Sequence, residues 1–293
     1  MTADQPAPPP PIRSLLFVPA NRADRMHKAL ATEADGVVFD LESAIPRGAA
    51  EEARANVRHA LDSHTPEQPA VFVRVCAVGT DDFTPDVEAC RHRSLTALML
   101  PQVAEPAEVA TASSALDGTD AWLMPLVETA SAVRQAYELA TASDRVAYMG
   151  GATGRHGDLG RSVGFQWTPE GTETLYLRQK VLIDVRAAGV ANPLSGLWGT
   201  VDDLDGLARF ATQTRQLGYE GMMAIHPSHL AIINTTFSPT PAEIDGWHRL
   251  IAAAEEAEAQ GIGAFRYEGR LIDHAHVLTA RQSLTRATHL GLT

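Results

Sequence analysis

Short apolar runs recur along the chain, and most of them end at a charged or polar residue or at a proline. Segments with the apolar spacing of amphipathic helices separate them, for example 169–189 and 204–217. Strands that alternate with helices, with no repeated hairpin signal, predict βα units and a parallel sheet. The clear runs are 14–18, 36–39, 70–73, 95–100, 121–127, 145–149 and 221–225, with a weaker one within 190–198.

The number of these runs bears on the fold. Seven clear strands and one weak strand favour an α/β fold, the (β/α)8 TIM barrel, which typically takes roughly 250 residues. A doubly wound sheet is the weaker alternative, because no dinucleotide-binding glycine pattern follows any strand. We expect a disordered Pro-rich N-terminus at 1–11 and a barrel at 12–240. A C-terminal helical extension at 241–293, with helices at 241–260 and 274–289, would pack on the barrel or on a neighbouring subunit.

Composition narrows the possible partners. Hydrophobic residues make up 45% of the chain, enough for a substantial core. The 24 basic and 36 acidic residues give a net charge of −12, which argues against nucleic acid and anionic membranes as partners. An anionic substrate would therefore need a local positive patch or a metal. Two cysteines are too few for a disulfide framework, so a reducing cytoplasm is expected.

Candidate chemistry lies where the strands end. In a TIM barrel all carboxyl ends of the strands meet at one face, so residues distant in sequence become neighbours there. The polar residues at or just beyond the predicted strand ends are Asp40, Glu42, Arg74, Glu128, Asp158 and His226.

Glu128 and Asp158 are candidate metal ligands. Hard cations such as Mg²⁺ bind oxygen ligands, often only one or two carboxylates, with water and substrate completing the shell. The sequence contains neither HExxH nor CxxC, so no strong zinc motif competes with this hypothesis. The alternative is that Glu128 is a solvated residue in the first turn of a helix, where the helix dipole favours it.

Other strand-end residues have two interpretations each. Arg74 suits a carboxylate or enolate oxygen, or else forms a salt bridge with Asp40 or Glu42 across the rim. The loop 150–157 brings backbone amides to an anion or is a plain connection. His226 is a packed rim residue or a base, and Asp273 is most simply an N-cap.

Several short segments occur together and in order. They are 13–19, 40–42, 73–75, 125–130, 158–159, 224–227 and 269–273. Together they resemble the citrate lyase β-subunit-like family, which includes malyl-CoA and citramalyl-CoA lyases. The resemblance covers almost everything from residue 12 to about 285.

This resemblance implies a (β/α)8 barrel that assembles as trimers or hexamers, and cleavage or formation of a C–C bond in a 3-hydroxyacyl-CoA thioester. The implied cofactor is Mg²⁺, with Mn²⁺ as an alternative, and CoA is part of the substrate. Each implied role falls on a residue of this chain. The implied metal ligands are Glu128 and Asp158, and Asp40 and Glu42 would order metal-bound water. Arg74 would bind the substrate, and Asp273 would enter the neighbouring subunit's site as an acid or base. The implied cations for the CoA phosphates are Arg13, Arg22 and Lys28, and the further substrate contacts are Gly157 and His226.

The chain departs from the family pattern at four places. Ser43 stands where an aspartate is usual, Cys76 where an asparagine is usual, and Gln102 where a lysine is usual. The loop from Gly151 to Asp158 is longer than in the family, and His156 within it is a possible substitute ligand or an added substrate contact. Because these changes surround the acyl-binding rim, we expect a divergent acyl substrate.

Four functions remain in competition. The leading hypothesis is a Mg²⁺-dependent lyase acting on a 3-hydroxyacyl-CoA. The others are a pyruvate-type aldolase on a free 2-oxo acid, a malyl-CoA thioesterase, and a non-catalytic barrel homologue. Neutralising the cations assigned to CoA should harm the first far more than the second, and the products distinguish a lyase from a thioesterase.

Overall fold

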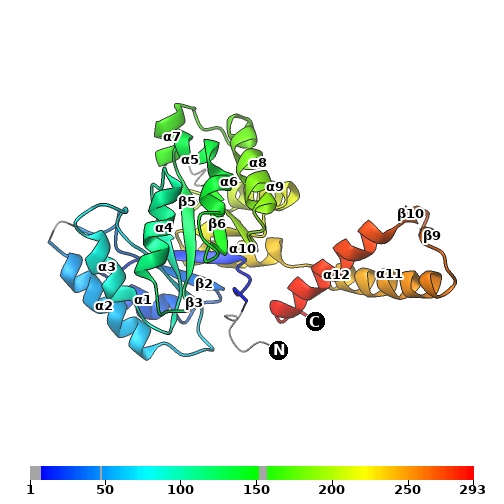
Figure 1. Ribbon diagram of the computed structural model, residues 1–293, viewed down its shortest axis with the longest axis horizontal. Helices are drawn as coiled ribbons and strands as arrows, with labels where there is room; N and C mark the ends of the chain where they lie inside the picture. Colours follow the sequence, from blue (N-terminus) through cyan, green and yellow to red (C-terminus); the bar gives the residue numbers. More distant parts are fainter. Residues whose placement is uncertain (1–7, 47, 152–156) are drawn as a thin grey trace. The chain divides into compact units, whose positions relative to one another are not determined.

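The computed structural model describes residues 8–46, 48–151 and 157–293. In this part of the chain, eight parallel strands close into a barrel, and each strand pairs with the next one in sequence until β8 pairs with β1 (Figure 1). The strands are β1 Ser14–Pro19, β2 Gly36–Asp40, β3 Ala70–Arg74, β4 Leu95–Leu100, β5 Trp122–Val127, β6 Tyr148–Gly151, β7 Asn192–Ser195 and β8 Gly221–Ala224. The predicted TIM barrel is confirmed.

Helices connect the strands and cover the outside of the barrel (Figure 1). Those up to residue 237 are α1 Ala23–Ala29, α2 Ala50–Ser63, α3 Phe83–Cys90, α4 Pro106–Ala115, α5 Ala130–Arg134, α6 Ala136–Ala140, α7 Asp158–Val163, α8 Thr172–Ala187, α9 Leu204–Leu217, the short 3₁₀ helix η1 Pro227–His229, and α10 Leu230–Phe237. The helix expected at 204–217 has these bounds, and the one expected at 169–189 is shorter at both ends.

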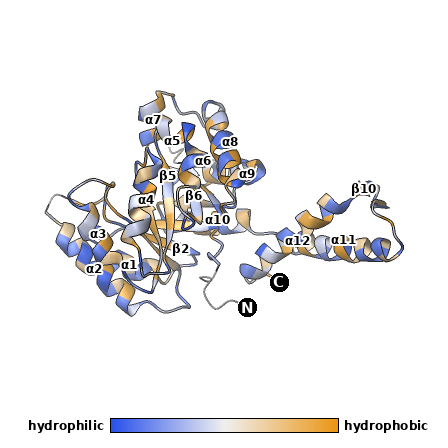
Figure 2. Ribbon diagram, viewed as in Figure 1, coloured by the Kyte–Doolittle hydropathy of each residue, from blue (hydrophilic) through white to orange (hydrophobic). Residues whose placement is uncertain are grey.

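Alternation along the strands divides the core in two. Leu16 and Val37 pack in a cluster that includes helix residues such as Val57, so their side chains lie between sheet and helices. Leu15 and Val38, one position away, belong to a second cluster built from strand residues, which fills the barrel. Figure 2 shows the result, with hydrophobic colour concentrated on the central strands and mixed colour on the surrounding helices.

Close strand packing also explains one glycine. A Cβ atom on Gly150 would lie 1.7 Å from the carbonyl oxygen of Leu194 on the neighbouring strand β7. Only glycine allows β6 to approach β7 so closely. The end of β6, from which the chain leads to Asp158, is therefore fixed by this contact.

The chain divides into two compact units, Met1–Phe237 and Ser238–Thr293. The second contains α11 Pro241–Ala259, the strands β9 Phe265–Tyr267 and β10 Arg270–Ile272, and α12 His274–His289. The two strands form a hairpin whose central residues, Glu268 and Gly269, both have positive φ, as a two-residue type I′ turn requires. This hairpin was not predicted from the sequence.

The expected disordered N-terminus falls partly outside the described residues, which begin at Pro8. Within the described part, the carbonyl oxygen of Pro10 accepts a hydrogen bond of 2.8 Å from the Tyr148 hydroxyl. The segment next to β1 is thus tied to a side chain in the barrel core. Among the described residues, no helix has the length and apolar character needed to cross a membrane.

Candidate active site

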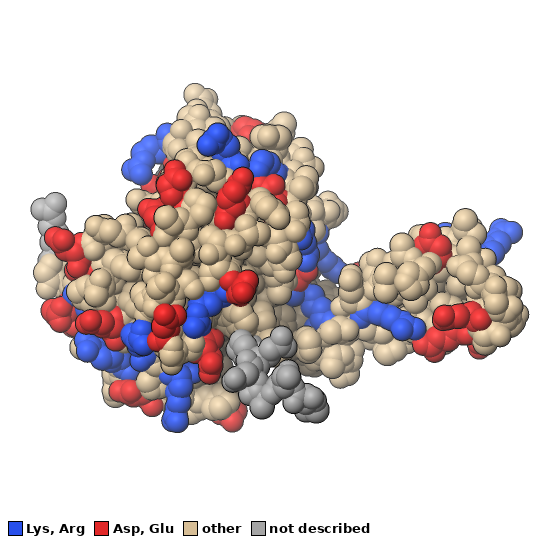
Figure 3. All heavy atoms as spheres, viewed as in Figure 1, with Lys and Arg blue, Asp and Glu red and all other residues tan. Residues whose placement is uncertain are grey.

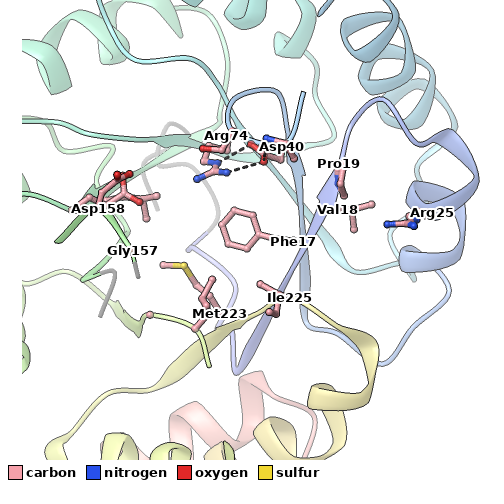
Figure 4. Close-up of a pocket in the computed structure, with 16 residues that line it drawn as sticks. Phe17, Val18, Pro19, Arg25, Asp40, Arg74, Gly157, Asp158, Met223 and Ile225 are labelled. Carbon is pink, nitrogen blue, oxygen red and sulfur yellow. Dashed lines mark hydrogen bonds and ion pairs between the residues drawn. The ribbon is translucent and has the colours of Figure 1, made fainter. Parts of the chain in front are cut away.

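A cavity of about 490 Å³ opens at the carboxyl ends of the barrel strands. Its polar lining comes from several strand ends, and its apolar lining includes Phe17, Leu126 and Met223. Figure 4 shows Asp158 and Arg25 at opposite ends of the view, with Phe17 between them and the Arg74–Asp40 pair beside it. The predicted strand-end residues that line it are Asp40, Arg74, Glu128 and Asp158, together with Gly157 and Ser43.

Arg74 and Asp40 form a two-pronged ion pair across neighbouring strands. They end β3 and β2 and are paired in register. Arg74 Nε donates to Asp40 Oδ1 at 2.8 Å and Nη2 to Oδ2 at 2.7 Å. Burial works against the charge of Arg74, but the hydrogen bonds and charge of Asp40 outweigh it and raise the pKa of the guanidinium. Asp40, 3% exposed, therefore fixes a permanently charged arginine at the rim.

The remaining contacts of Arg74 fix its position further. Its Nη1 lies 3.3 Å from Glu42 Oε2, and its guanidinium stacks 5.1 Å from the ring centroid of Phe17. Asp40 also accepts the backbone N–H groups of Glu42 and Ala44, at 3.0 and 3.2 Å. Both oxygens of Asp40 are thus occupied by donors, as suits a positioning group better than a proton carrier. Arg74 therefore forms the expected salt bridges with Asp40 and Glu42, and its contact with a carboxylate or enolate oxygen stays a prediction.

Glu128 is a buried carboxylate directly after β5. It is only 6% exposed, and its Oε2 accepts the backbone N–H of Gln102 at 3.0 Å. Desolvation raises the pKa of Glu128, although the Gln102 hydrogen bond and the charge of Arg74 act in the opposite direction. Because Glu128 is buried, it is not the solvated first-turn helix residue of the alternative interpretation.

Asp158 is the first residue of α7, with Gly157 at the N-cap position. It is more open than Glu128, with 34% of its side chain exposed, and it forms a 2.7 Å ion pair with Arg161 Nη2. Its charge is close enough to raise the pKa of Glu128. His156, the possible substitute, and most of the enlarged loop lie outside the described residues.

The charges of the cavity fit a divalent cation. Asp40 pairs with Arg74, Asp158 pairs with the exposed Arg161, and the carboxylates of Glu128 and Asp158 line the same cavity. A cation bound there would relieve the cost of the buried Glu128 charge. No group of three or more His, Cys, Asp or Glu side chains among the described residues is arranged to hold a metal. Two carboxylates nevertheless suffice for Mg²⁺, whose other ligands are usually water and substrate.

A second cavity, of about 410 Å³, adjoins the first. Both are lined by Phe17, Val18, Pro19, Arg25 and Ile225. The second adds Lys28 and His226, whose Nδ1 lies 2.8 Å from the Ser228 hydroxyl. Arg22 lines neither cavity and pairs with Asp24 at 3.2 Å on the surface. The arginine and lysine side chains that line this second cavity are therefore Arg25 and Lys28.

Arg13 occupies another part of the barrel, which corrects its assignment to the CoA phosphates. It precedes β1, at the amino end of the strand, whereas the cavity is lined by Pro19 at the carboxyl end. Arg13 binds Asp35 through its backbone N–H, Nε and Nη2 at 2.7 to 2.8 Å. The hydrogen bonds to Asp35 raise the pKa of Arg13, although burial acts in the opposite direction. Its role is to hold the start of β1.

We expect Arg13→Ala to reduce stability without changing substrate affinity. Loss of a mostly buried, hydrogen-bonded ion pair should lower the free energy of unfolding by about 1–3 kcal/mol, while KM for any CoA ester stays within about twofold. Chemical denaturation and steady-state kinetics on the same preparation measure both quantities. A tenfold rise in KM with an unchanged free energy of unfolding would instead indicate that Arg13 contacts the CoA ester.

Asp273 belongs to the second unit, where it caps α12. Its Oδ1 accepts the backbone N–H groups of Ala275 and His276 at 3.1 and 3.4 Å, so the predicted N-cap is confirmed. The same oxygen lies 2.6 Å from His276 Nδ1, and this hydrogen bond lowers the pKa of Asp273. The side chain is thus an exposed carboxylate, the form required of a base.

Comparison with known proteins fits this geometry. The profile of the HpcH/HpaI aldolase/citrate lyase family matches residues 13–227. The chain belongs to this family. A (3S)-malyl-CoA thioesterase of Cereibacter sphaeroides is 32% identical, covering 94% of this chain and 95% of that protein. The citrate lyase subunit beta of Leuconostoc mesenteroides is 30% identical, covering 95% and 94%.

Solved structures agree. CitE from Mycobacterium tuberculosis in complex with magnesium, acetoacetate and coenzyme A aligns with a TM-score of 0.75 and 28% identity, over 97% of this chain and all of that one. The citrate lyase beta subunit of the same organism, with oxaloacetate and magnesium, aligns with a TM-score of 0.67, over 78% and 98%. The predicted family and the predicted enzyme of the aldolase and citrate lyase type are confirmed.

In this member of the aldolase/citrate lyase family, three cavity features were not predicted from the sequence. Arg25 lies one helical turn before Lys28 and was passed over, although the i, i+3 spacing puts both on one helix face. Phe17 stacks on Arg74, and the N–H of Gln102 holds Glu128. The last two depend on contacts between different strands, for which the local sequence carries no signal.

The face of this enzyme drawn in Figure 3 carries charges of both signs, although the net charge is −12. Figure 3 shows acidic and basic side chains interspersed over the face of the barrel in view, without a continuous field of one sign. The arginine and lysine side chains that line the two cavities are Arg74, Arg25 and Lys28.

Proposed function

We propose that this protein is a Mg²⁺-dependent carbon–carbon lyase that cleaves or forms a 3-hydroxyacyl-CoA thioester of the malyl-CoA or citramalyl-CoA type. The observation that carries the proposal is the combination of paired carboxylates, a fixed arginine and an adjoining cavity lined by cations. The first part suits the oxoacid end of such a substrate, and the second suits the phosphates of CoA.

The chain's own residues have distinct parts in this proposal. Arg74, held by Asp40 and Glu42, points a fixed positive charge at the oxygen on which negative charge develops when the C–C bond breaks. Because the guanidinium is already held in place, little reorganisation is needed during the reaction. Asp40 and Glu42 thus act by orienting Arg74. The apolar side chains of Phe17, Leu126 and Met223 exclude water from the enolate product.

Glu128 and Asp158 are the residues that would hold the cation. Mg²⁺ bound there supplies a Lewis acid that polarises the carbonyl group of the oxoacid half. Asp273, as a carboxylate, is proposed to take the proton of the substrate hydroxyl and, in a later step, to deliver it to the enolate carbon, which gives the shorter acyl-CoA; the synthetic direction reverses both transfers. Because Asp273 belongs to the separate second unit, we propose that it serves the site of a neighbouring subunit in a homotrimer or hexamer.

Sharing of sites between subunits predicts complementation. Asp273→Asn keeps a helix-capping side chain but removes the base, and Glu128→Gln removes the metal ligand in the other unit. When the two inactive proteins are mixed under conditions of subunit exchange, we expect recovery of about a quarter of wild-type activity, because one site in four combines two intact residues. Mass spectrometry of the mixed oligomers verifies exchange, and exchanged oligomers without activity would contradict a shared site.

The cavity cations predict a dependence on CoA. Arg25→Ala or Lys28→Ala should raise KM for a hydroxyacyl-CoA about tenfold, because each removes one charge-assisted contact to phosphate. Turnover of free oxaloacetate or a free hydroxy acid should not change. Arg58→Ala, at an exposed arginine on α2 that lines neither cavity, is the matched control. Equal effects on CoA esters and free acids would favour the free-acid aldolase.

A thioesterase is the second candidate, because a relative at 32% identity is a (3S)-malyl-CoA thioesterase. Product analysis separates the two reactions. We expect malyl-CoA or citramalyl-CoA, incubated with Mg²⁺, to yield a 2-oxoacid and a shorter acyl-CoA in equal amounts, with no free thiol. Release of free CoA with a hydroxy acid would instead establish hydrolysis, and turnover of neither ester would count against the proposal.

A further inference from the structure

Gln102 has a backbone conformation that is unusual for its residue type. Its φ angle is 53°, in the left-handed region that favours glycine. Among the non-glycine residues that the structure describes, only Glu268 shares a positive φ, and that residue lies in the hairpin turn of the second unit. Such strained positions persist only where the surrounding structure fixes them, and they cluster at functional sites.

The contact made by Gln102 uses its backbone and not its side chain. The residue is exposed, but its N–H points inward and donates to Glu128 Oε2 at 3.0 Å. It is the second residue after the end of β4 and lies between the buried residues Pro101 and Val103. The turn is therefore anchored on both sides, and the left-handed residue between the anchors aims one amide at the carboxylate.

We propose that Gln102 is a positioning residue for the metal site, whose left-handed backbone holds the Glu128 carboxylate in its binding orientation. The inference rests on the proposed function, because it acts through Glu128 on the cation. Hydrogen-bond partners of metal ligands commonly contribute 10- to 100-fold to metal affinity, since they fix the ligand before the metal arrives. Here the conformation of residue 102 is what matters, and its side chain is replaceable.

A substitution series separates conformation from side chain. Gln102→Gly and Gln102→Asn both tolerate positive φ, whereas the β-branched Gln102→Val and Gln102→Thr do not. The measurement is the dissociation constant for Mg²⁺ alone, by calorimetry on the full chain without substrate. We expect Gly and Asn to bind Mg²⁺ within about twofold of wild type, and Val and Thr to bind about tenfold more weakly. Glu268→Val is the matched control, because it introduces the same type of strain in the hairpin of the second unit, and its Mg²⁺ affinity should not change.

Each possible outcome of this series either supports or contradicts the positioning role of Gln102. Loss of affinity in Gly and Asn as large as in Val would show that the glutamine side chain acts, and would overturn the inference. Unchanged affinity in Val and Thr, with their melting temperatures recorded, would overturn it as well. An equal loss in Glu268→Val would reduce the effect to general destabilisation. If wild type binds Mg²⁺ no better than Glu128→Gln, the proposed function itself fails, and that result is distinct from failure within the series.

Discussion

Replacing Glu128 with glutamine is expected to abolish Mg²⁺-dependent turnover while leaving the fold at least as stable. The substitution keeps the shape and an acceptor for the Gln102 N–H, but it removes one of the two cavity carboxylates proposed to bind the metal. Without that charge, we expect weaker Mg²⁺ binding and a fall in kcat/KM of about 10³-fold or more, comparable to losing a major electrostatic contribution at the transition state.

The stability half of this prediction follows from the pKa of Glu128. Desolvation raises it above its ordinary value, so the folded metal-free protein disfavours the ionised form. The group therefore contributes most to stability below its unfolded pKa, and it becomes unfavourable as pH rises through the raised folded pKa. At neutral pH, glutamine removes this cost, and Tm without metal should equal or exceed that of wild type.

Calorimetry with added Mg²⁺ measures the loss of metal binding. Thermal unfolding in EDTA measures the Tm of the metal-free protein. Glu138→Gln, at an exposed glutamate on α6, is the control and should match wild type in activity and Tm. If the Glu128→Gln enzyme were active, the assignment of Glu128 as a metal ligand would be wrong. An inactive protein with a markedly lower Tm would indicate that Glu128 supports the fold instead.

Arg74→Ala is expected to be both unstable and inactive. Asp40, 3% exposed, would lose its ion pair with Arg74 and keep two backbone N–H donors. Breaking a buried ion pair in this way costs about 3–5 kcal/mol, so we expect a fall in unfolding free energy of about 3 kcal/mol. Loss of the fixed positive charge should also lower kcat about 10³-fold.

A second substitution separates the two effects. Asp40→Asn in the Arg74→Ala background removes the unpaired charge, so stability should largely return while activity does not. The single and double variants form a double-mutant cycle, in which urea denaturation measures the free energy of unfolding and steady-state kinetics measures activity. Recovery of activity along with stability would show that Arg74 serves only to neutralise Asp40, and the proposed contact to substrate would be wrong.

The barrel was predictable from the sequence because its signal is local. A buried parallel strand is a short apolar run, and the polar residue that stops it reaches the rim. Asp40, Arg74, Glu128 and Asp158 were therefore identified from their position after such runs, and the structure brings all four to one cavity. The family segments added Asp273, whose capping role the sequence also indicated.

What the sequence left out depends on geometry between distant elements. Arg13 carries the right charge, but it precedes its strand and so reaches the opposite end of the barrel. The left-handed turn at Gln102 has no glycine to signal it. The hairpin of β9 and β10 has three-residue strands and a Glu-Gly turn in place of the common Asn-Gly, too weak a pattern to detect.

Two departures from the family pattern now have a physical account. Ser43 lines the cavity and donates a hydrogen bond to Glu42, so it modifies the acidic cluster around Arg74. Cys76 donates its backbone N–H to Asp86 at 2.9 Å, and burial raises the pKa of its thiol to about 12. It is a neutral thiol at physiological pH and so lacks the thiolate form that a nucleophile requires.

The central claim is that Glu128 and Asp158 hold the catalytic cation. Anomalous diffraction from crystals grown with Mn²⁺ in place of Mg²⁺ tests it most directly, because it locates the ion without reference to activity. We predict one strong peak within bonding distance of both carboxylates, absent from crystals of Glu128→Gln. A peak bound elsewhere, or one that persists in the Glu128→Gln crystals, would contradict the account.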